Sequence, residues 1–368
     1  MIESLHISGF KLFRDLTLPK LGRMNLFVGE NNTGKSSLLE AVGLYAGRNP
    51  VADVLRTAGL RSQEALRPWE VDGWNEEGTA LRHAVFDLFR REGAMGNLRA
   101  YPLLIGRVGD PSPLRIKVQF HDLVTDENGI RRYVPVQPGH PTVGHLELAL
   151  TIYRGDKQIA LVTRRHLPFR SPSLDLLQPY DGGLGATHLP SNGFDEEIAA
   201  FLWDQLIQGP GQERVFGWLR LVDPRIQDLD YIAGRGTSRI ALLKVEGEGR
   251  IPLSTMGDGL RRMFHIGLAM ATASKGVLLI DEFENGLHWR VQRELWVALG
   301  KAAQEFDVQI FAATHSRDCI GGFVSASTEL GIRDATLYRM EREGDEIYAV
   351  NLALINVEDA LEVNGEVR

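Results

Sequence analysis

The sequence has one cysteine, no long apolar run and no sustained heptad pattern. Cys319 alone cannot form a disulfide within the chain or a cysteine zinc cluster, which fits a reducing compartment. No segment approaches the roughly 18 apolar residues of a membrane-spanning helix. The N-terminus also lacks the basic start and apolar stretch of a signal peptide. We therefore expect a cytoplasmic protein with no membrane partner and no coiled-coil arms.

Acidic residues outnumber basic ones, and the 368-residue chain has a formal net charge of -7. This balance argues against a protein that coats nucleic acid by bulk attraction. Isolated basic pairs are usually solvated, and phosphate binding needs several of them clustered. DNA binding through a local basic stripe therefore stays open. The basic pairs are Arg90-Arg91, Arg131-Arg132, Arg164-Arg165 and Arg261-Arg262.

A glycine-rich segment near the N-terminus carries the clearest chemical signal. It reads Gly-Glu-Asn-Asn-Thr-Gly-Lys-Ser over residues 29–36, between an apolar run at 24–28 and a helical-looking run at 37–42. These residues would form a strand, a loop and a helix in that order. The backbone N–H groups of the loop would hold the α- and β-phosphates. Lys35 would reach the β- and γ-phosphates, and Ser36 would ligate Mg²⁺. We expect a nucleoside triphosphate site. Its predicted binding residues are Gly29, Glu30, Asn31, Asn32, Thr33, Gly34, Lys35, Ser36 and Ser37.

Two adjacent acids follow a second apolar run, residues 275–280. In a doubly wound parallel sheet ligands gather at the carboxyl ends of the strands, so Asp281 would lie beside the phosphate loop and complete the Mg²⁺ shell. Glu282 would face the γ-phosphate, where an acid can orient and deprotonate the attacking water. The pair therefore predicts a metal ligand and a catalytic base.

A third apolar run, residues 308–313, ends at Thr314 and His315. A histidine at this sheet edge has a geometric reason to face the nucleotide, and we predict a γ-phosphate sensor. Upstream, Gly257-Asp258-Gly259 precedes an apolar helix near 265–273. Glycines with a polar residue opening a helix can form an anion site, although this pattern is also a common turn and cap.

Together these elements resemble the ABC-type ATPases of the SMC, RecF and OLD branch. The sequence is most similar to bacterial AAA-family ATPases of the abortive-infection, OLD-like type that lack a Toprim domain. The resemblance covers residues 1–50 and 240–368. It rests on the runs Gly-Glu-Asn-Asn-Thr-Gly-Lys-Ser-Ser, Met-Gly-Asp-Gly-Leu-Arg-Arg, Asp-Glu-Phe-Glu-Asn-Gly-Leu-His and Ala-Thr-His-Ser-Arg-Asp.

The resemblance implies an α/β fold, an ABC-type ATPase head. In such a head a mostly parallel sheet is flanked by helices and joined by an N-terminal antiparallel β layer. Residues 1–50 and 240–368 would form this discontinuous ATPase domain, with a large mixed α+β insertion at 51–239 as a lid or effector-contact domain.

The resemblance also implies roles for the motifs. The loop at 29–37 becomes Walker A, residues 257–262 the signature, Asp281-Glu282 Walker B, residues 284–288 the D-loop and His315 the switch histidine. Lys35, Glu282 and His315 would be catalytic, and Ser36 and Asp281 would bind Mg²⁺.

The signature of such proteins acts in trans. Two subunits would sandwich two ATP molecules head to tail, so ATP would stabilise a homodimer. The signature residues implied to bind ATP are Gly257, Asp258, Gly259 and Arg262. Gly257 replaces the usual serine, with Ser254 or Thr255 as alternative hydroxyl donors. The Q-loop glutamine has Gln119 and Gln137 as candidates.

Within the insertion, the patterns predict a helix near 79–92 and strands near 114–120 and 145–153. They also predict a loop at 181–185 and two helices, near 195–206 and 212–221. Trp203 and Trp218 occupy amphipathic positions on these helices, which indicates core packing. The segment after His315 is too short for a Toprim nuclease domain.

The leading hypothesis is an ATPase that dimerises on ATP and controls a separately encoded effector, such as a nuclease, or a nucleic-acid substrate. Anti-phage defence and DNA repair are the roles that the resemblance implies. An ATP-gated DNA-binding switch with little turnover is the alternative, against which Glu282 argues. A transporter subunit is disfavoured by the large insertion and the absence of the usual transporter signature. The phosphate loop does not contact the base, so it does not distinguish ATP from GTP.

Overall fold

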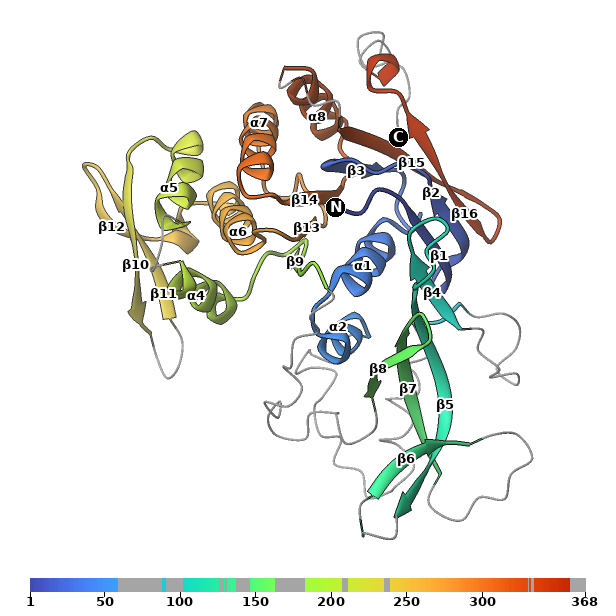
Figure 1. Ribbon diagram of the computed structural model, residues 1–368. Coiled ribbons are helices and arrows are strands. Elements are labelled where there is room, and N and C mark those ends of the chain that lie inside the picture. Colours follow the sequence, from blue (N-terminus) through green and yellow to red (C-terminus); the bar gives the residue numbers. More distant parts are fainter. Residues whose placement is uncertain are drawn as a thin grey trace.

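The computed structural model arranges the chain around three sheets (Figure 1). It describes residues 1–58, 88–90, 102–125, 129, 131–136, 146–162, 183–206, 211–234, 239–329, 331 and 334–357. Within these ranges no helix is both long and apolar enough to cross a membrane.

The central sheet has six strands in the order β16-β15-β3-β14-β13-β9. Four of its five strand pairings are parallel, and the fifth is the antiparallel β15–β16 hairpin. The strands at its centre are predominantly apolar, with Asn25 and Gln309 as buried polar exceptions, and they are buried on both faces, as expected for parallel strands covered by helices. The strand bounds are β3 Met24–Val28, β9 Ala186–Leu189, β13 Val277–Ile280, β14 Gln309–Ala313, β15 Ala335–Glu343 and β16 Glu346–Leu352.

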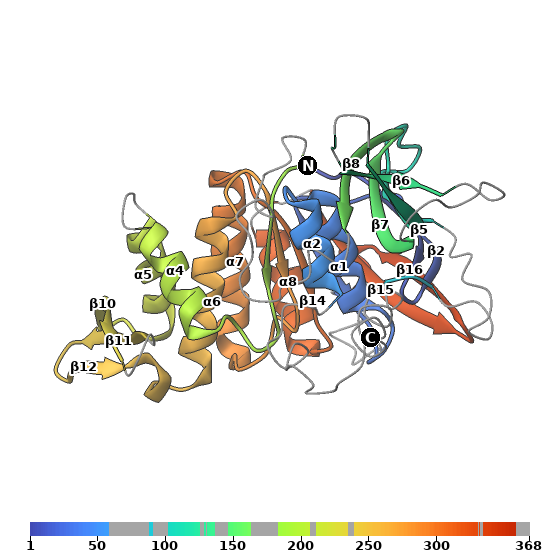
Figure 2. The same cartoon turned by 90° about the horizontal axis from the view of Figure 1, so that it is seen from below.

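Helices cover both faces of this sheet, and alternate strand residues point into two separate cores. Leu278 and Ile280 belong to the core under α6, α7 and α8, whereas Leu279 belongs to the core under α1. Figure 2 shows α6 and α7 on one side and α1 and α2 on the other. The helix bounds are α1 Lys35–Ala46, α2 Pro50–Thr57, α6 Asp258–Thr272, α7 Trp289–Glu305 and α8 Arg317–Glu329.

An antiparallel sheet forms a second layer beside α1 and continues well beyond it (Figure 1). Its path is β2-β1-β4-β5-β7-β8, with β6 paired to β5. The predicted N-terminal antiparallel layer is therefore confirmed, and strands from the middle of the chain extend it. The bounds are β1 Leu5–Phe10, β2 Phe13–Leu18, β4 Leu103–Gly106, β5 Leu114–Thr125, β6 Arg131–Pro135, β7 Leu146–Arg154 and β8 Lys157–Val162.

A third lobe packs a small sheet and two helices against α6 (Figure 1). Trp203 is buried and meets Phe216 edge to face, with ring centroids 5.5 Å apart, and Trp218 packs against the same core. The core-packing interpretation of both tryptophans is thus confirmed. The bounds are α4 Glu196–Gln205, α5 Gly211–Val222, β10 Ile226–Ala233, β11 Arg239–Val245 and β12 Gly249–Pro252.

Most elements predicted between residues 51 and 239 occur within a few residues of their expected bounds. The two strands are β5 and β7, and the two late helices are α4 and α5. Residues 79–87, 91 and 92 of the expected early helix, and residues 181 and 182 of the expected loop, lie outside the described ranges. The helix prediction is wrong for Leu88–Arg90, because Phe89 forms a bridge with Phe10 of β1.

The division into an ATPase domain and an insertion stays a prediction, and the strand pairing bears on it. Strand β4 pairs with β1, and β9 pairs with β13. Strands from residues 51–239 therefore belong to the antiparallel sheet and to the central sheet, and both sheets also contain strands from the rest of the chain.

Candidate nucleotide-binding site

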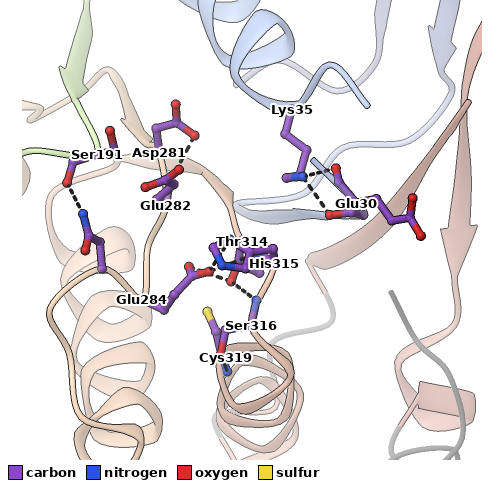
Figure 3. Close-up of polar contacts among 12 residues, drawn as sticks. Glu30, Lys35, Ser191, Asp281, Glu282, Glu284, Thr314, His315, Ser316 and Cys319 are labelled. Atoms are coloured by element: carbon purple, nitrogen blue, oxygen red, sulfur yellow. Dashed lines mark hydrogen bonds and ion pairs between the residues drawn. The ribbon is translucent and has the colours of Figure 1, made fainter. Parts of the chain in front are cut away.

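One cavity, of about 260 Å³, lies where β3, β13 and β14 end. The three predicted motifs meet there although some 280 residues separate the first from the last (Figure 3). Gly29, Glu30 and Thr33 belong to the same loop but do not line the cavity. The lining residues are Leu12, Asn31, Asn32, Gly34, Lys35, Ser36, Ser37, Asp281, Glu282, Ala313, Thr314 and His315.

The phosphate loop is shaped by two glycines and one lysine. Gly34 has φ of +89°, and a Cβ there would lie 2.9 Å from the Phe13 ring. A Cβ on Gly29 would lie 2.5 Å from the Met340 carbonyl oxygen. Lys35 Nζ donates to the carbonyls of Gly29 and Glu30 at 2.7 and 2.6 Å (Figure 3). Only glycine fits these two positions, and the folded loop holds the lysine at the cavity.

The electrostatics of the cavity centre on Lys35. Partial burial lowers the pKa of its ammonium, because desolvation disfavours the charged form. The carboxylates of Asp281, Glu284 and Glu282, in that order, oppose this shift. Lys35 offers a positive charge to an anionic phosphate, whereas the Asp281 and Glu282 carboxylates on the same cavity wall would repel that phosphate unless a divalent cation lay between them.

The buried side chain of Arg262 forms hydrogen bonds to the backbone of the two acids that follow β13. Asp281 Oδ1 accepts the Glu282 N–H at 3.1 Å. Glu282 has φ of +45°, a left-handed conformation that typically costs about 1–3 kcal/mol and clusters at functional sites. Arg262 donates to the carbonyl oxygens of Asp281 and Glu282 at 2.6 and 3.0 Å. These hydrogen bonds stabilise the turn that places both carboxylates at the cavity.

Arg262 was predicted from the signature motif to bind nucleotide, yet its guanidinium lies inside the protein. It is 4% exposed, and burial lowers its pKa to about 10. It also donates to the carbonyls of Pro190 and Ser191 at 2.7 and 3.1 Å. Its contacts thus connect α6, the segment after β9 and the segment after β13.

Glu284 was not among the predicted site residues, but it contacts His315 and fixes its position. Its carboxylate accepts the Thr314 hydroxyl at 2.7 Å and the His315 backbone N–H at 3.0 Å (Figure 3). His315 Nδ1 also lies 3.0 Å from Glu284 Oε1. A proton on Nδ1 satisfies this contact and leaves Nε2 available to the cavity. In the sequence, Glu284 is the last acid of the run Asp-Glu-Phe-Glu. The prediction from the strand end covered only the first two acids, Asp281 and Glu282.

If the cavity hydrolyses ATP as the sequence predicts, Glu284→Gln is expected to lower kcat about tenfold with little change in KM. The amide keeps the size but weakens the charge-assisted contacts that orient His315, each worth roughly 1.5–3 kcal/mol. Steady-state kinetics measures this split. Glu294→Gln, an exposed carboxylate on α7, is the matched control. A kcat equal to that of the control would show that Glu284 does not act through His315.

The signature residues do not reach the cavity of their own chain. Gly257 and Asp258 are exposed at the start of α6, and Asp258 pairs with Arg261 at 2.9 Å. A Cβ on Gly259 would lie 3.0 Å from the Gly286 carbonyl oxygen. The exposed helix N-terminus therefore sits directly on the 284–288 loop. Ser254 and Thr255, the alternative hydroxyl donors, are exposed just before it.

Of the two Q-loop candidates, the structure describes Gln119 alone. Gln119 lies on β5 and does not line it. Gln137 lies outside the described residues.

The fold and the site together define the class of protein. A mostly parallel sheet carries a strand, phosphate loop and helix, with paired acids and a histidine after neighbouring strands, and this is an ABC-type ATPase head. Residues 109–318 match the family model described as "AAA domain, putative AbiEii toxin, Type IV TA system". Residues 1–51 match a model described as "AAA ATPase domain". The first match spans more than half of the chain, which therefore belongs to that family of AAA ATPase domains.

Individual relatives agree with this assignment. An ATP/GTP phosphatase of Helicobacter pylori is 25% identical over 344 residues, covering 87% of this chain and 86% of the relative. An uncharacterised protein of Methanocaldococcus jannaschii is 49% identical over 45 residues, 12% of this chain and 20% of the relative. An SMC head solved with the C-winged helix domain of ScpA superposes with a TM-score of 0.51 at 13% identity, covering 97% and 99% of the two chains. This last likeness shows a shared fold.

Proposed function

We propose that this protein binds and hydrolyses ATP with Mg²⁺. The observation that carries the proposal is the single cavity shared by Lys35, Ser36, Asp281, Glu282 and His315. Phosphoryl transfer asks the protein for positioning and charge compensation, and these side chains supply both. The phosphatase activity in the name of the Helicobacter pylori relative supports the same reaction.

Each side chain has a distinct part in the proposed reaction. Lys35 balances charge on the β- and γ-phosphates, and the loop N–H groups hold the α- and β-phosphates. Glu282 orients the attacking water and accepts its proton. His315, whose Nδ1–H faces Glu284, donates from Nε2 toward the γ-phosphate in its doubly protonated form, since the neutral ring has only one N–H.

The oxygen donors at the cavity fit Mg²⁺. Mg²⁺ is usually bound through one or two protein oxygens together with substrate phosphates, and Ser36 and Asp281 both line the cavity. Across the described ranges no group of three or more His, Cys, Asp or Glu residues could hold a metal. Bound there, Mg²⁺ would neutralise charge that develops on the phosphates.

The placement of the signature supports a composite site in a homodimer. Its exposed helix N-terminus lies outside the cavity of its own chain, and such a terminus suits an anion brought by another molecule. In the proposed dimer, each signature helix closes on the ATP that its partner holds. ATP then stabilises the dimer because it binds the pair better than the separate subunits.

A mixing experiment tests whether the site is shared. Lys35→Ala removes the phosphate cation, and Asp258→Trp blocks the exposed start of α6, so each variant alone should be inactive. In a mixture, one of the two sites of a heterodimer combines an intact phosphate loop with an intact signature, and ATPase activity should return. A mixture that stays inactive, with both variants folded, would contradict the shared site.

We further propose that ATP-driven closing and opening controls a separately encoded effector, such as a nuclease, in anti-phage defence. The family description that includes the AbiEii toxin supports a defence role, and the ScpA domain bound to the SMC head shows that this fold can dock a partner protein. Measuring hydrolysis with and without duplex DNA separates this proposal from direct DNA control. A strong stimulation by DNA alone would favour the DNA-repair alternative.

A further inference from the structure

Phe283 is the only apolar residue in the run Asp-Glu-Phe-Glu that follows β13. Its side chain is fully buried, whereas Glu282 before it lines the cavity and Glu284 after it contacts His315 (Figure 3). The Phe283 N–H donates to the carbonyl of Ala313, the last residue of β14, at 3.0 Å. Phe283 therefore joins the ends of the two strands that precede the predicted catalytic base and the switch histidine.

The Phe283 ring belongs to a buried aromatic cluster, which consists of Phe283, Trp296 and Phe323. The ring lies parallel to the Trp296 indole of α7, with centroids 3.9 Å apart and planes 6° apart. Trp296 in turn meets Phe323 of α8 edge to face at 5.0 Å. Because α8 begins at Arg317, directly after the segment that carries His315, the cluster fixes the turn after β13 relative to this segment.

We propose that Phe283 is a positioning residue for hydrolysis, which by packing on Trp296 sets where the Glu282 carboxylate lies and thereby sets kcat. This inference rests on the proposed function, because it assumes that Glu282 activates the attacking water. A general base must lie within hydrogen-bond reach of the proton that it accepts. A misplacement of about 1 Å can slow a reaction about 100-fold, so an anchor directly beside Glu282 affects the rate strongly.

The backbone of Glu282 explains why an anchor is needed there. Its φ of +45° lies in the left-handed region, which a residue with a Cβ keeps only where the surrounding structure holds it. Arg262 holds the turn through the carbonyls of Asp281 and Glu282, and Phe283 holds it on the other side. If Phe283 lost its contact with Trp296, the turn could relax, and a change of φ at Glu282 would redirect its carboxylate.

The groups that would bind MgATP are held independently of the aromatic cluster. Lys35 and Ser36 begin α1, which covers the other face of the central sheet. Asp281 is fixed by its own N–H, which donates to the Leu189 carbonyl of β9 at 3.2 Å. Loss of the cluster should therefore lower kcat and leave nucleotide affinity unchanged.

Phe283→Leu tests this separation in the full-length chain. Leucine keeps an apolar side chain of similar size, so the variant should fold, but it cannot stack flat on the indole. We expect kcat for ATP hydrolysis to fall about tenfold. The affinity for a non-hydrolysable ATP analogue with Mg²⁺, measured by calorimetry, should stay within about twofold of the wild-type value.

Phe216→Leu is the matched control, because Phe216 of α5 is buried against another tryptophan, Trp203, and does not line the cavity. It should lose thermal stability to a similar extent and keep the wild-type kcat. The proposal is overturned if Phe283→Leu hydrolyses ATP as fast as this control. It is also overturned if Phe283→Leu weakens binding of the analogue by as large a factor as it lowers kcat.

A double-mutant cycle tests whether Phe283 acts through Trp296. Trp296→Leu should lower kcat about as much as Phe283→Leu does, whereas Trp296→Phe keeps an aromatic face and should retain about half of the wild-type kcat or more. The double variant should be no slower than the slower single variant, because both leucines remove the same contact. Effects that multiply in the double variant would overturn the proposal, as would equal kcat values for Trp296→Leu and Trp296→Phe.

The variants at Trp296 also decide the question if Phe283→Leu does not fold, since their kcat values report on the same contact. Wild-type protein that binds the analogue but does not hydrolyse ATP would overturn the proposed function and this inference with it. Wild-type hydrolysis with no difference between Phe283→Leu and Phe216→Leu would overturn this inference alone.

Discussion

Glu282→Gln is expected to slow ATP hydrolysis by roughly 10²–10⁴-fold, the usual contribution of general-base assistance. Glutamine keeps the size of the side chain but cannot accept the proton of the attacking water. Binding of MgATP should persist, since Lys35, Ser36 and Asp281 are unchanged at the cavity. Single-turnover phosphate release, together with an equilibrium binding measurement, separates these two effects.

The same variant should accumulate dimers in the presence of MgATP. Hydrolysis would normally reopen the proposed sandwich, so a nucleotide that persists holds it closed. Sedimentation with and without MgATP reports the change, and Glu294→Gln serves as the control. A Glu282→Gln protein that stays monomeric at saturating MgATP contradicts the sandwich, even if hydrolysis is slow. If the wild-type protein hydrolyses ATP no faster than Glu282→Gln, the proposed ATPase activity is contradicted. The ATP-gated binding switch would then be the function that remains.

Lys35→Ala is expected to weaken MgATP binding roughly 100-fold or more and to abolish turnover. The ammonium would contact two phosphates, and each charge-assisted contact contributes about 1.5–3 kcal/mol. Calorimetric titration with MgATP measures the loss, and thermal unfolding verifies the fold. Lys301→Ala, an exposed lysine on α7, is the control. If Lys35→Ala bound MgATP as tightly as this control, the nucleotide would not occupy the phosphate loop.

The sequence was sufficient to predict the core of the fold because its signals are local and strong. Buried parallel strands are mostly apolar in sequence, as at 24–28 and 308–313, where Asn25 and Gln309 are the polar exceptions, and polar residues follow each strand. Since parallel strands end at one edge of a sheet, the meeting of Lys35, Asp281 and His315 could be expected before any coordinates existed.

The contacts that support the site were not predictable in the same way. Arg262 was assigned to nucleotide, but its guanidinium is buried on carbonyls from residues up to 72 positions away. Glu284 contacts His315 across 31 positions, and no spacing rule specifies such a contact. Strand β4 pairs with β1 although the two are about 100 residues apart in the sequence. Composition and periodicity can indicate a strand, but they do not indicate which strand it pairs with. These features depend on tertiary packing.

The most direct test is an experimental structure of Glu282→Gln with MgATP. We expect one triphosphate per chain between Lys35 and the acids that follow β13, with a Mg²⁺ ion bound by Ser36 and Asp281 and the signature of a second subunit against the γ-phosphate. A nucleotide bound away from the phosphate loop, or a metal that Ser36 and Asp281 do not share, would contradict it.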